Sequence, residues 1–242
     1  MIESLLLAVT RIATVKDGRE KTNATGFFFE RDGGLYLVTA RHVVREEAAN
    51  HFPDSLLIDL HSNPDNVAQV TRFSIPLYSG GAPVWREGLD SAGDVDVAVL
   101  ALDRPALPAT LHLRAFSPAH LVQQLDEIEV GTPIVVVGFP LGFEDMLHHL
   151  PVARQGIVST SFGLRFQGQG YFLTDARMHR GASGAPVVAR TPSSKSGRED
   201  LPWRLLGIHT SRMDVTNRDI EEDSRLNLNT AWYADIILSL TT

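Results

Sequence analysis

Short apolar segments of strand length, separated by glycine and proline, recur along most of this 242-residue chain. Runs of this length that are rich in Val, Ile, Leu and Phe and bounded by turn residues favour β-strands. Hydrophobic residues make up 43% of the sequence, which is enough to enclose a sizeable core. The pattern predicts an all-β protein of barrel or sandwich type, with strands at 9–15, 24–30, 34–40, 55–61, 71–78, 95–102, 132–140, 154–160, 170–176, 185–190 and 203–211.

The predicted strands fall into two groups. Residues 103–127 lack a clear period, which indicates a connector, and we place the first β module at 1–110, the connector at 111–127 and the second module at 128–242. The second module is expected to end in a helix with Thr230 or Asn229 as its N-cap, because Trp232, Ile236 and Leu240 recur at helical spacing. Loops are expected at 79–94, 191–200 and 213–227.

Charge and composition exclude several classes of partner and environment. A net charge of −7 leaves no excess of basic residues for nucleic acid, and the chain contains no cysteine for disulfides. The apolar run near the N-terminus contains Glu3 and is interrupted by Arg11, so it is read as a strand and not as a secretion signal. We expect a soluble, cytoplasmic protein that binds neither nucleic acid nor membranes.

Ser183 lies between two glycines in the segment RGASGAP. Small neighbours allow a tight bend, in which the amides of Gly181 and Ser183 both point at one spot and serve as an oxyanion hole. A glycine-rich hairpin is the alternative interpretation of these residues. A serine becomes a nucleophile only when a base removes its proton, so a histidine and a carboxylate are needed.

His42 is the strongest candidate for that base, since it follows a β-strand in YLVTARHVV. Asp94 and Asp96 begin a strand that must be buried, and a carboxylate there needs a partner such as a histidine N–H. Six other histidines have polar neighbours and are expected in loops or at the surface. The pair His148–His149 lacks further ligands at helpful spacing, so no metal site and no cofactor are expected. The six are His51, His61, His112, His120, His148 and His149.

Three motifs resemble those of trypsin-like (chymotrypsin-fold) serine peptidases: TARHVV, DVAVL and GASGAP, in the order His, Asp, Ser. The segments GFPLG, RQGIVS, TDARMHRGASGAP and LGIHTS further resemble bacterial HtrA/Deg-type peptidase domains. The resemblance implies a single peptidase domain of two six-stranded antiparallel β-barrels with the active site between them. It also implies the triad His42, Asp96 and Ser183, with Asp94 as a flanking residue, and an oxyanion hole from Gly181 and Ser183.

Other residues depart from the best-known members of the family. Ala182 stands where digestive members have an aspartate that pairs with a new N-terminus, so that activation switch is not expected. LGIHTS is similar to a glutamyl-endopeptidase motif, which implies a substrate pocket lined by Arg177, Met178, His209 and Thr210. Met178 replaces the hydroxyl residue of those enzymes, so two specificities stay open: acidic side chains, and small or apolar ones.

The predicted function is a serine endopeptidase that acts on protein or peptide substrates. The 242 residues contain no PDZ-like segment, so we expect a regulatory partner, a ligand or a narrow substrate range to restrain proteolysis. A catalytically silent binding module with the same fold is the alternative, although all three triad residues are present. An esterase of another fold is disfavoured by the order of the triad.

Overall fold

The computed structural model describes residues 2–191, 201–212 and 226–242, and almost all of their regular structure is β. The strands of the first half are β1 (Val9–Lys16), β2 (Arg19–Arg31), β3 (Gly34–Thr39), β4 (Ser55–His61), β5 (Val70–Pro76), β6 (Tyr78–Ser79), β7 (Ala82–Pro83), β8 (Trp85–Asp90) and β9 (Gly93–Leu102). Those of the second half are β10 (Pro133–Gly138), β11 (Val152–Ile157), β12 (Tyr171–Thr174), β13 (Pro186–Arg190), β14 (Trp203–Arg212) and β15 (Asn229–Tyr233).

The helices are single turns or little more. The α-helices are α1 (Arg41–Val44) and α3 (Ile236–Leu240), and the 3-10 helices are η1 (Leu6–Ala8), η2 (Arg104–Ala106), η3 (Pro118–His120), η4 (Leu125–Glu127), η5 (Pro140–Gly142) and η6 (Phe166–Gly168). No helix among the described residues has the length and apolar character needed to span a membrane.

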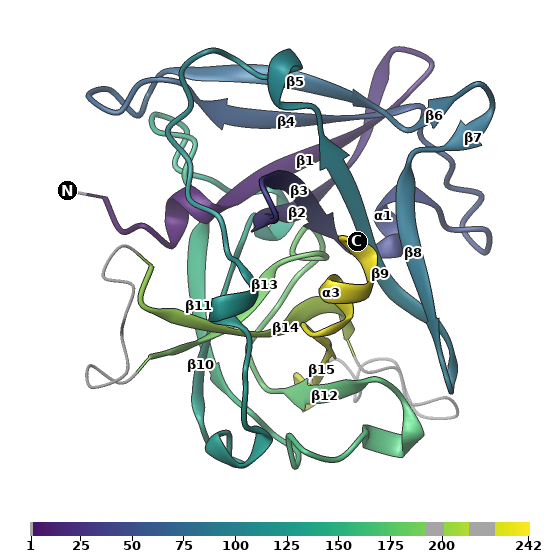
Figure 1. Cartoon of the computed structure of the whole chain (residues 1–242), viewed down its shortest axis with the longest axis vertical. Helices are drawn as coiled ribbons and strands as arrows, with labels where there is room; N and C mark the ends of the chain where they lie inside the picture. Colours follow the sequence, from purple (N-terminus) through teal and green to yellow (C-terminus); the bar gives the residue numbers. More distant parts are fainter. Residues whose placement is uncertain (1, 192–200, 213–225) are drawn as a thin grey trace.

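Two curled antiparallel sheets lie one above the other (Figure 1). The first has the strand order β5-β4-β1-β2-β3-β9-β8 and the second β11-β10-β13-β14-β15-β12. The chymotrypsin-like, all-β architecture with a short C-terminal helix is therefore as predicted. The first sheet has seven strands where six were expected, because β8 pairs with β9 inside the segment 79–94 that had been read as a loop.

Tight turns and strand alternation explain the first sheet. Asp17-Gly18 and Asp32-Gly33 all have positive φ, from 50° to 82°, as the hairpin turns between twisted antiparallel strands require. Successive side chains of β2 point to opposite faces, so Phe28 packs inside the first sheet while Phe27 and Phe29 face the second. The triplet of phenylalanines therefore builds two cores at once.

The core between the sheets also buries the C-terminal helix. Ile237 and Leu240 of α3 lie in the same apolar cluster as Phe27, Phe29 and Phe139. A separate cluster fills the second sheet, with Val136, Phe172 and Leu206 among its members. The burial of large side chains on both faces of β2 fixes the two sheets against each other.

Several local predictions were wrong or lie outside the described residues. Residues 229–233 form β15, which pairs with β12 and β14, so the C-terminal helix begins only at Ile236. Asp235, not Thr230 or Asn229, occupies its N-cap position. His61 and His120 are buried, not exposed as predicted. Most of the loops expected at 191–200 and 213–227 lies outside the described residues.

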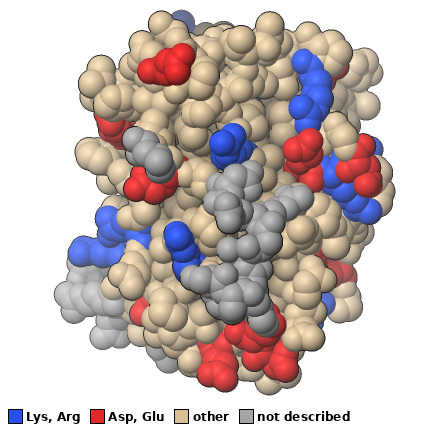
Figure 2. All heavy atoms as spheres, turned by 60° about the vertical axis from the view of Figure 1, so that its left-hand side comes forward, with Lys and Arg blue, Asp and Glu red and all other residues tan. Residues whose placement is uncertain are grey.

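Charged side chains are spread over the surface in small groups. On the face shown in Figure 2, the described Lys, Arg, Asp and Glu residues form small groups between areas of uncharged surface, and acidic side chains gather at its lower edge. The described side chains of that face form no continuous basic stripe of the kind that follows a phosphate backbone.

Thr25 of β2 joins the two sheets through its hydrogen bonds. Its hydroxyl donates to the carbonyl oxygen of Gly181 at 2.8 Å and accepts the backbone N–H of Phe139 at 3.1 Å. Its own N–H donates to the carbonyl oxygen of Ser183 at 2.9 Å. All of these groups are held in the contact between the sheets, and Thr25 itself is fully buried.

We expect Thr25→Val to destabilise the protein, because it keeps the side-chain shape while leaving the Phe139 N–H and the Gly181 carbonyl unpaired in a buried place. The expected loss is about 2 to 4 kcal/mol in the free energy of unfolding, measured by urea denaturation. Thr71→Val is the matched control at an exposed position of β5, where the side chain makes no described hydrogen bond, with an expected loss below about 1 kcal/mol. Equal losses for the two variants would contradict the special role of Thr25.

Candidate active site

His42 is presented by α1, the single helical turn that follows β3. Val43 and Val44 of this turn are buried in the core of the first sheet, which leaves the His42 side chain on the open side. Asp96 lies in β9, the neighbour of β3, at the end of the strand face that carries Ala98 and Leu100. The pairing of β3 with β9 therefore brings the histidine and the carboxylate together.

Both carboxylate oxygens of Asp96 bind His42. Oδ2 lies 2.9 Å from the imidazole Nδ1, and Oδ1 accepts the backbone N–H of His42 at 3.0 Å. Two bonds to one residue fix the ring orientation, and they place the proton on Nδ1 so that the lone pair is on Nε2. This is the tautomer that a general base requires.

Opposing effects act on the pKa of His42. Burial lowers it, but the hydrogen bond and negative charge of Asp96, together with the charge of Glu46, outweigh burial and raise the pKa above 6.5. The carboxylate therefore stabilises the imidazolium that forms when His42 takes up a proton.

Asp94, the other carboxylate of this strand, has a different partner. Its side chain is exposed and its Oδ2 lies 3.2 Å from Nη1 of Arg41. The structure thus brings Asp96, and not Asp94, to His42.

Ser183 stands in a tight bend between β12 and β13. The N–H groups of Ala182, Gly184 and Ala185 donate to the carbonyls of His179, His209 and Ala182, in that order. Among the described hydrogen bonds, none uses the N–H of Gly181 or of Ser183. The bend therefore keeps two amide donors available while its other donors are occupied.

The orientation of the Gly181 amide has an identifiable cause. The Arg180 carbonyl accepts the Leu141 N–H at 2.5 Å, and in a trans peptide the following N–H points the opposite way. Gly181 has a φ of +91°, and a Cβ there would lie 2.5 Å from the Phe139 carbonyl oxygen. Only glycine meets both conditions without strain.

The Ser183 hydroxyl is bonded away from His42 in this structure. Its Oγ donates to the Thr210 carbonyl oxygen at 3.0 Å, and no described hydrogen bond joins it to the imidazole. His42 and Ser183 nevertheless line the same cavity of about 490 Å³.

That cavity includes most of the predicted substrate-binding residues. Met178, His209 and Thr210 line it, and all three are buried. Arg177 is exposed and is not among the lining residues. The remaining lining residues are Leu141, His179, Arg180 and Ser211. His179 and Arg180 belong to the run before the glycine bend that the sequence places near the pocket, whereas the sequence had not singled out Leu141 or Ser211.

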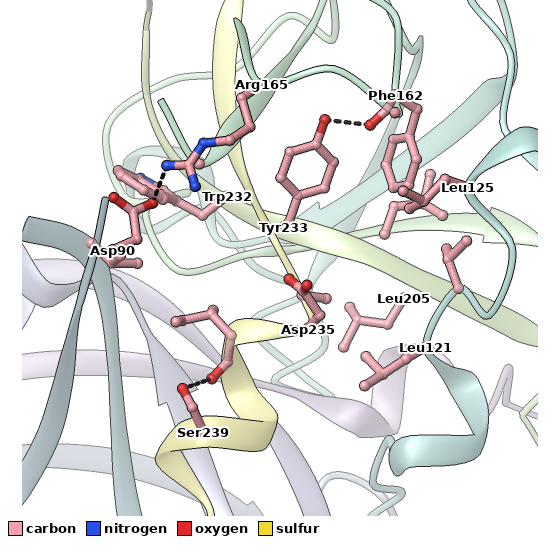
Figure 3. Close-up of a pocket in the computed structure, with 17 residues that line it drawn as sticks. Asp90, Leu121, Leu125, Phe162, Arg165, Leu205, Trp232, Tyr233, Asp235 and Ser239 are labelled. Carbon is pink, nitrogen blue, oxygen red and sulfur yellow. Dashed lines mark hydrogen bonds and ion pairs between the residues drawn. The ribbon is translucent and has the colours of Figure 1, made fainter. Parts of the chain in front are cut away.

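A second cavity, of about 470 Å³, lies beside the C-terminal helix, which contributes Ile236 and Ser239 to its lining (Figure 3). Its walls are mainly apolar, and its polar groups are largely paired: Asp90 with Arg165, and the Tyr233 hydroxyl with the Phe162 carbonyl. Burial raises the pKa of Tyr233 to about 12, with a further rise from the Asp235 charge. Among the described residues of its lining there is no histidine to activate the Ser239 hydroxyl, so these residues do not supply the groups for acyl transfer.

Known structures share this arrangement of sheets. The HtrA-type protease AlgW, solved with a tripeptide, has 18% sequence identity and a TM-score of 0.57, covering 98% of this chain and 59% of that one. A serine endoprotease from Yersinia pestis has 16% identity and a TM-score of 0.54, with coverage of 98% and 62%. The chain thus spans less than two thirds of the length of both proteins. No curated protein sequence is significantly similar to it.

A family match agrees with the fold. Residues 24–192, more than half of the chain, match the family described as Trypsin-like peptidase domain. The matched span contains His42, Asp96 and Ser183. The chain therefore belongs to the trypsin-like peptidase domain family of serine endopeptidases.

Proposed function

We propose that the protein cleaves peptide bonds with His42 as general base, Asp96 as the group that orients it, and Ser183 as nucleophile. The observation that carries the proposal is that both carboxylate oxygens of Asp96 bind His42, and that His42 lines the same cavity as Ser183. The backbone N–H groups of Gly181 and Ser183 support it, because they have no acceptor among the described residues. A charged intermediate needs such donors already in place.

The reaction begins when the Ser183 hydroxyl turns from the Thr210 carbonyl toward Nε2 of His42. Oγ attacks the substrate carbonyl carbon while its proton passes to Nε2, and the carbonyl oxygen becomes an oxyanion held by the two amides. Collapse breaks the C–N bond, and the departing amine takes the proton from His42. Water, deprotonated by the same imidazole, then releases the second product and restores Ser183.

The lining of the cleft supports a narrow substrate range. Arg180, His179 and His209 contribute cationic or basic groups, and no Asp or Glu is among the described lining residues. A Lys or Arg side chain of a substrate therefore meets repulsion and lacks a partner there. We infer that acidic or uncharged side chains are preferred next to the scissile bond.

Asp96→Asn is expected to reduce kcat/KM by roughly four orders of magnitude, because the amide no longer fixes the tautomer of His42. The pH profile provides a second readout. Catalysis needs neutral His42, so wild-type activity falls as the pH drops through a pKa above 6.5. Without the Asp96 charge this pKa falls, and the residual activity of the variant extends to lower pH.

Asp94→Asn is the control for this experiment, because it removes a carboxylate of the same strand that pairs only with Arg41. We expect its rate to stay within about twofold of wild type. A large loss in this variant and a small one in Asp96→Asn would reverse the assignment.

A fluorophosphonate probe is expected to label wild-type protein and Ser211→Ala but not Ser183→Ala. Ser211 is the matched control, since it is a second serine of the same cleft. If cleavage is restrained or selective, the unlabelled wild-type enzyme digests casein only slowly. Brisk casein digestion without additives would contradict the restraint. Absence of any Ser183-dependent label would contradict the enzymatic proposal and favour a silent binding module.

Arg180→Glu is expected to reverse the charge preference of the cleft. Relative to wild type, the ratio of cleavage rates for peptides with Lys and with Glu before the scissile bond rises roughly tenfold, as measured by kcat/KM. Arg177→Glu is the control, because that side chain lies outside the cavity lining. An equal change in both variants would show a general surface-charge effect.

A further inference from the structure

Three side chains far apart in sequence meet beside the first sheet: Asp59 of β4, and Glu144 and His149 of the loop after η5. One ligand-type atom from each lies within 4.8 Å of the others. All three side chains are largely buried, with exposed fractions of 11%, 15% and 30%. The sequence had suggested no metal site because these residues have no recognisable spacing.

Two buried atoms of this cluster lack hydrogen-bond partners. They are Oε2 of Glu144 and Nδ1 of His149, both without solvent contact. His149 Nδ1 and Glu144 Oε1 face each other at 3.6 Å, which is too long for a hydrogen bond. Ligands of a tetrahedral zinc ion stand about 3.4 Å apart, given bonds of about 2.1 Å. The pair therefore already has the spacing of two ligands of one ion.

The charged groups around the cluster carry a net negative charge that a cation can compensate. Arg72 Nε lies 3.4 Å from one oxygen of Asp59, and Arg11 Nη1 lies 3.8 Å from the other, both longer than strong ion pairs. Both guanidiniums are shared with Glu20. The group thus contains three carboxylates and two guanidiniums, which leaves one carboxylate charge without a guanidinium to compensate it. The carboxylates are those of Asp59, Glu144 and Glu20, and the guanidiniums are those of Arg11 and Arg72.

We propose that Asp59, Glu144 and His149 bind a divalent transition-metal ion of the zinc class. The imidazole nitrogen favours such an ion over Ca²⁺ or Mg²⁺, which prefer oxygen ligands. Three protein ligands and a water complete a tetrahedral shell. None of the three residues lines the catalytic cleft, so the ion has a structural role.

The position of the loop indicates what the ion stabilises. The ion fastens the loop to β4, and the same loop begins at η5, where Leu141 donates its N–H to the Arg180 carbonyl. That bond orients the Gly181 amide, so a fixed loop supports the proposed oxyanion hole. This step rests on the proposed function, whereas metal binding does not.

Zinc titration of the chelator-treated full chain, followed by calorimetry and thermal unfolding, tests the proposal. We expect one Zn²⁺ per chain at this site and a rise in Tm of about 5 to 10 °C at a hundredfold excess over Kd. Glu144→Gln and His149→Ala lose this binding event. His148→Ala keeps it, because His148 pairs with Asp145 outside the cluster.

Cobalt provides a direct view of the ligands. Co²⁺ bound with imidazole and carboxylates gives visible absorption bands, which we expect in wild type and His148→Ala but not in His149→Ala. Zinc uptake that Glu144→Gln and His149→Ala leave unchanged would overturn the proposal, as would stabilisation by Ca²⁺ or Mg²⁺ in place of Zn²⁺. Neither measurement depends on Ser183, so an inactive enzyme leaves the test intact.

Discussion

The hydrogen bonds of Thr25 are the constraint on which the site depends. A single residue of β2 binds the carbonyls of Gly181 and Ser183, so the bend that carries Ser183 is attached to the opposite sheet. The Thr25 carbonyl accepts the Thr39 hydroxyl at 2.8 Å, and Thr39 is the last residue of β3, three residues before His42. The proposed base and the proposed nucleophile are therefore both positioned by contacts to Thr25, and acyl transfer tolerates little displacement between the two.

The two glycines around Ser183 are required for two different reasons where the two sheets meet. Gly181 has to turn its amide toward the cleft with a positive φ, against the Phe139 carbonyl. Gly184 has to let Thr25 approach, because a Cβ there would lie 2.1 Å from the Thr25 carbonyl oxygen. The glycine pattern that predicted a nucleophile is thus also the pattern that lets the two sheets touch at Thr25.

Local signals in the sequence were enough for most strands, since turn chemistry and apolar runs act over a few residues. They failed at 229–233, where pairing with β12 and β14 overrides a helical spacing of apolar side chains. The residues of the proposed triad were predicted from motifs, but the role of Thr25 was not, because a threonine inside a strand is ordinary. The Asp59, Glu144 and His149 cluster was equally hidden, since only the fold brings β4 and the loop after η5 together.

In the proposed triad, His42 is already positioned for the reaction, whereas Ser183 is not. His42 is fixed by two hydrogen bonds, whereas Ser183 has to give up its bond to the Thr210 carbonyl before it reacts. Such a bond is worth about 1 kcal/mol, so it slows the reaction roughly fivefold at most. That is too weak to restrain a peptidase. The restraint that we propose therefore has to lie outside this bond, and we assign it to substrate selection by the basic lining around Arg180.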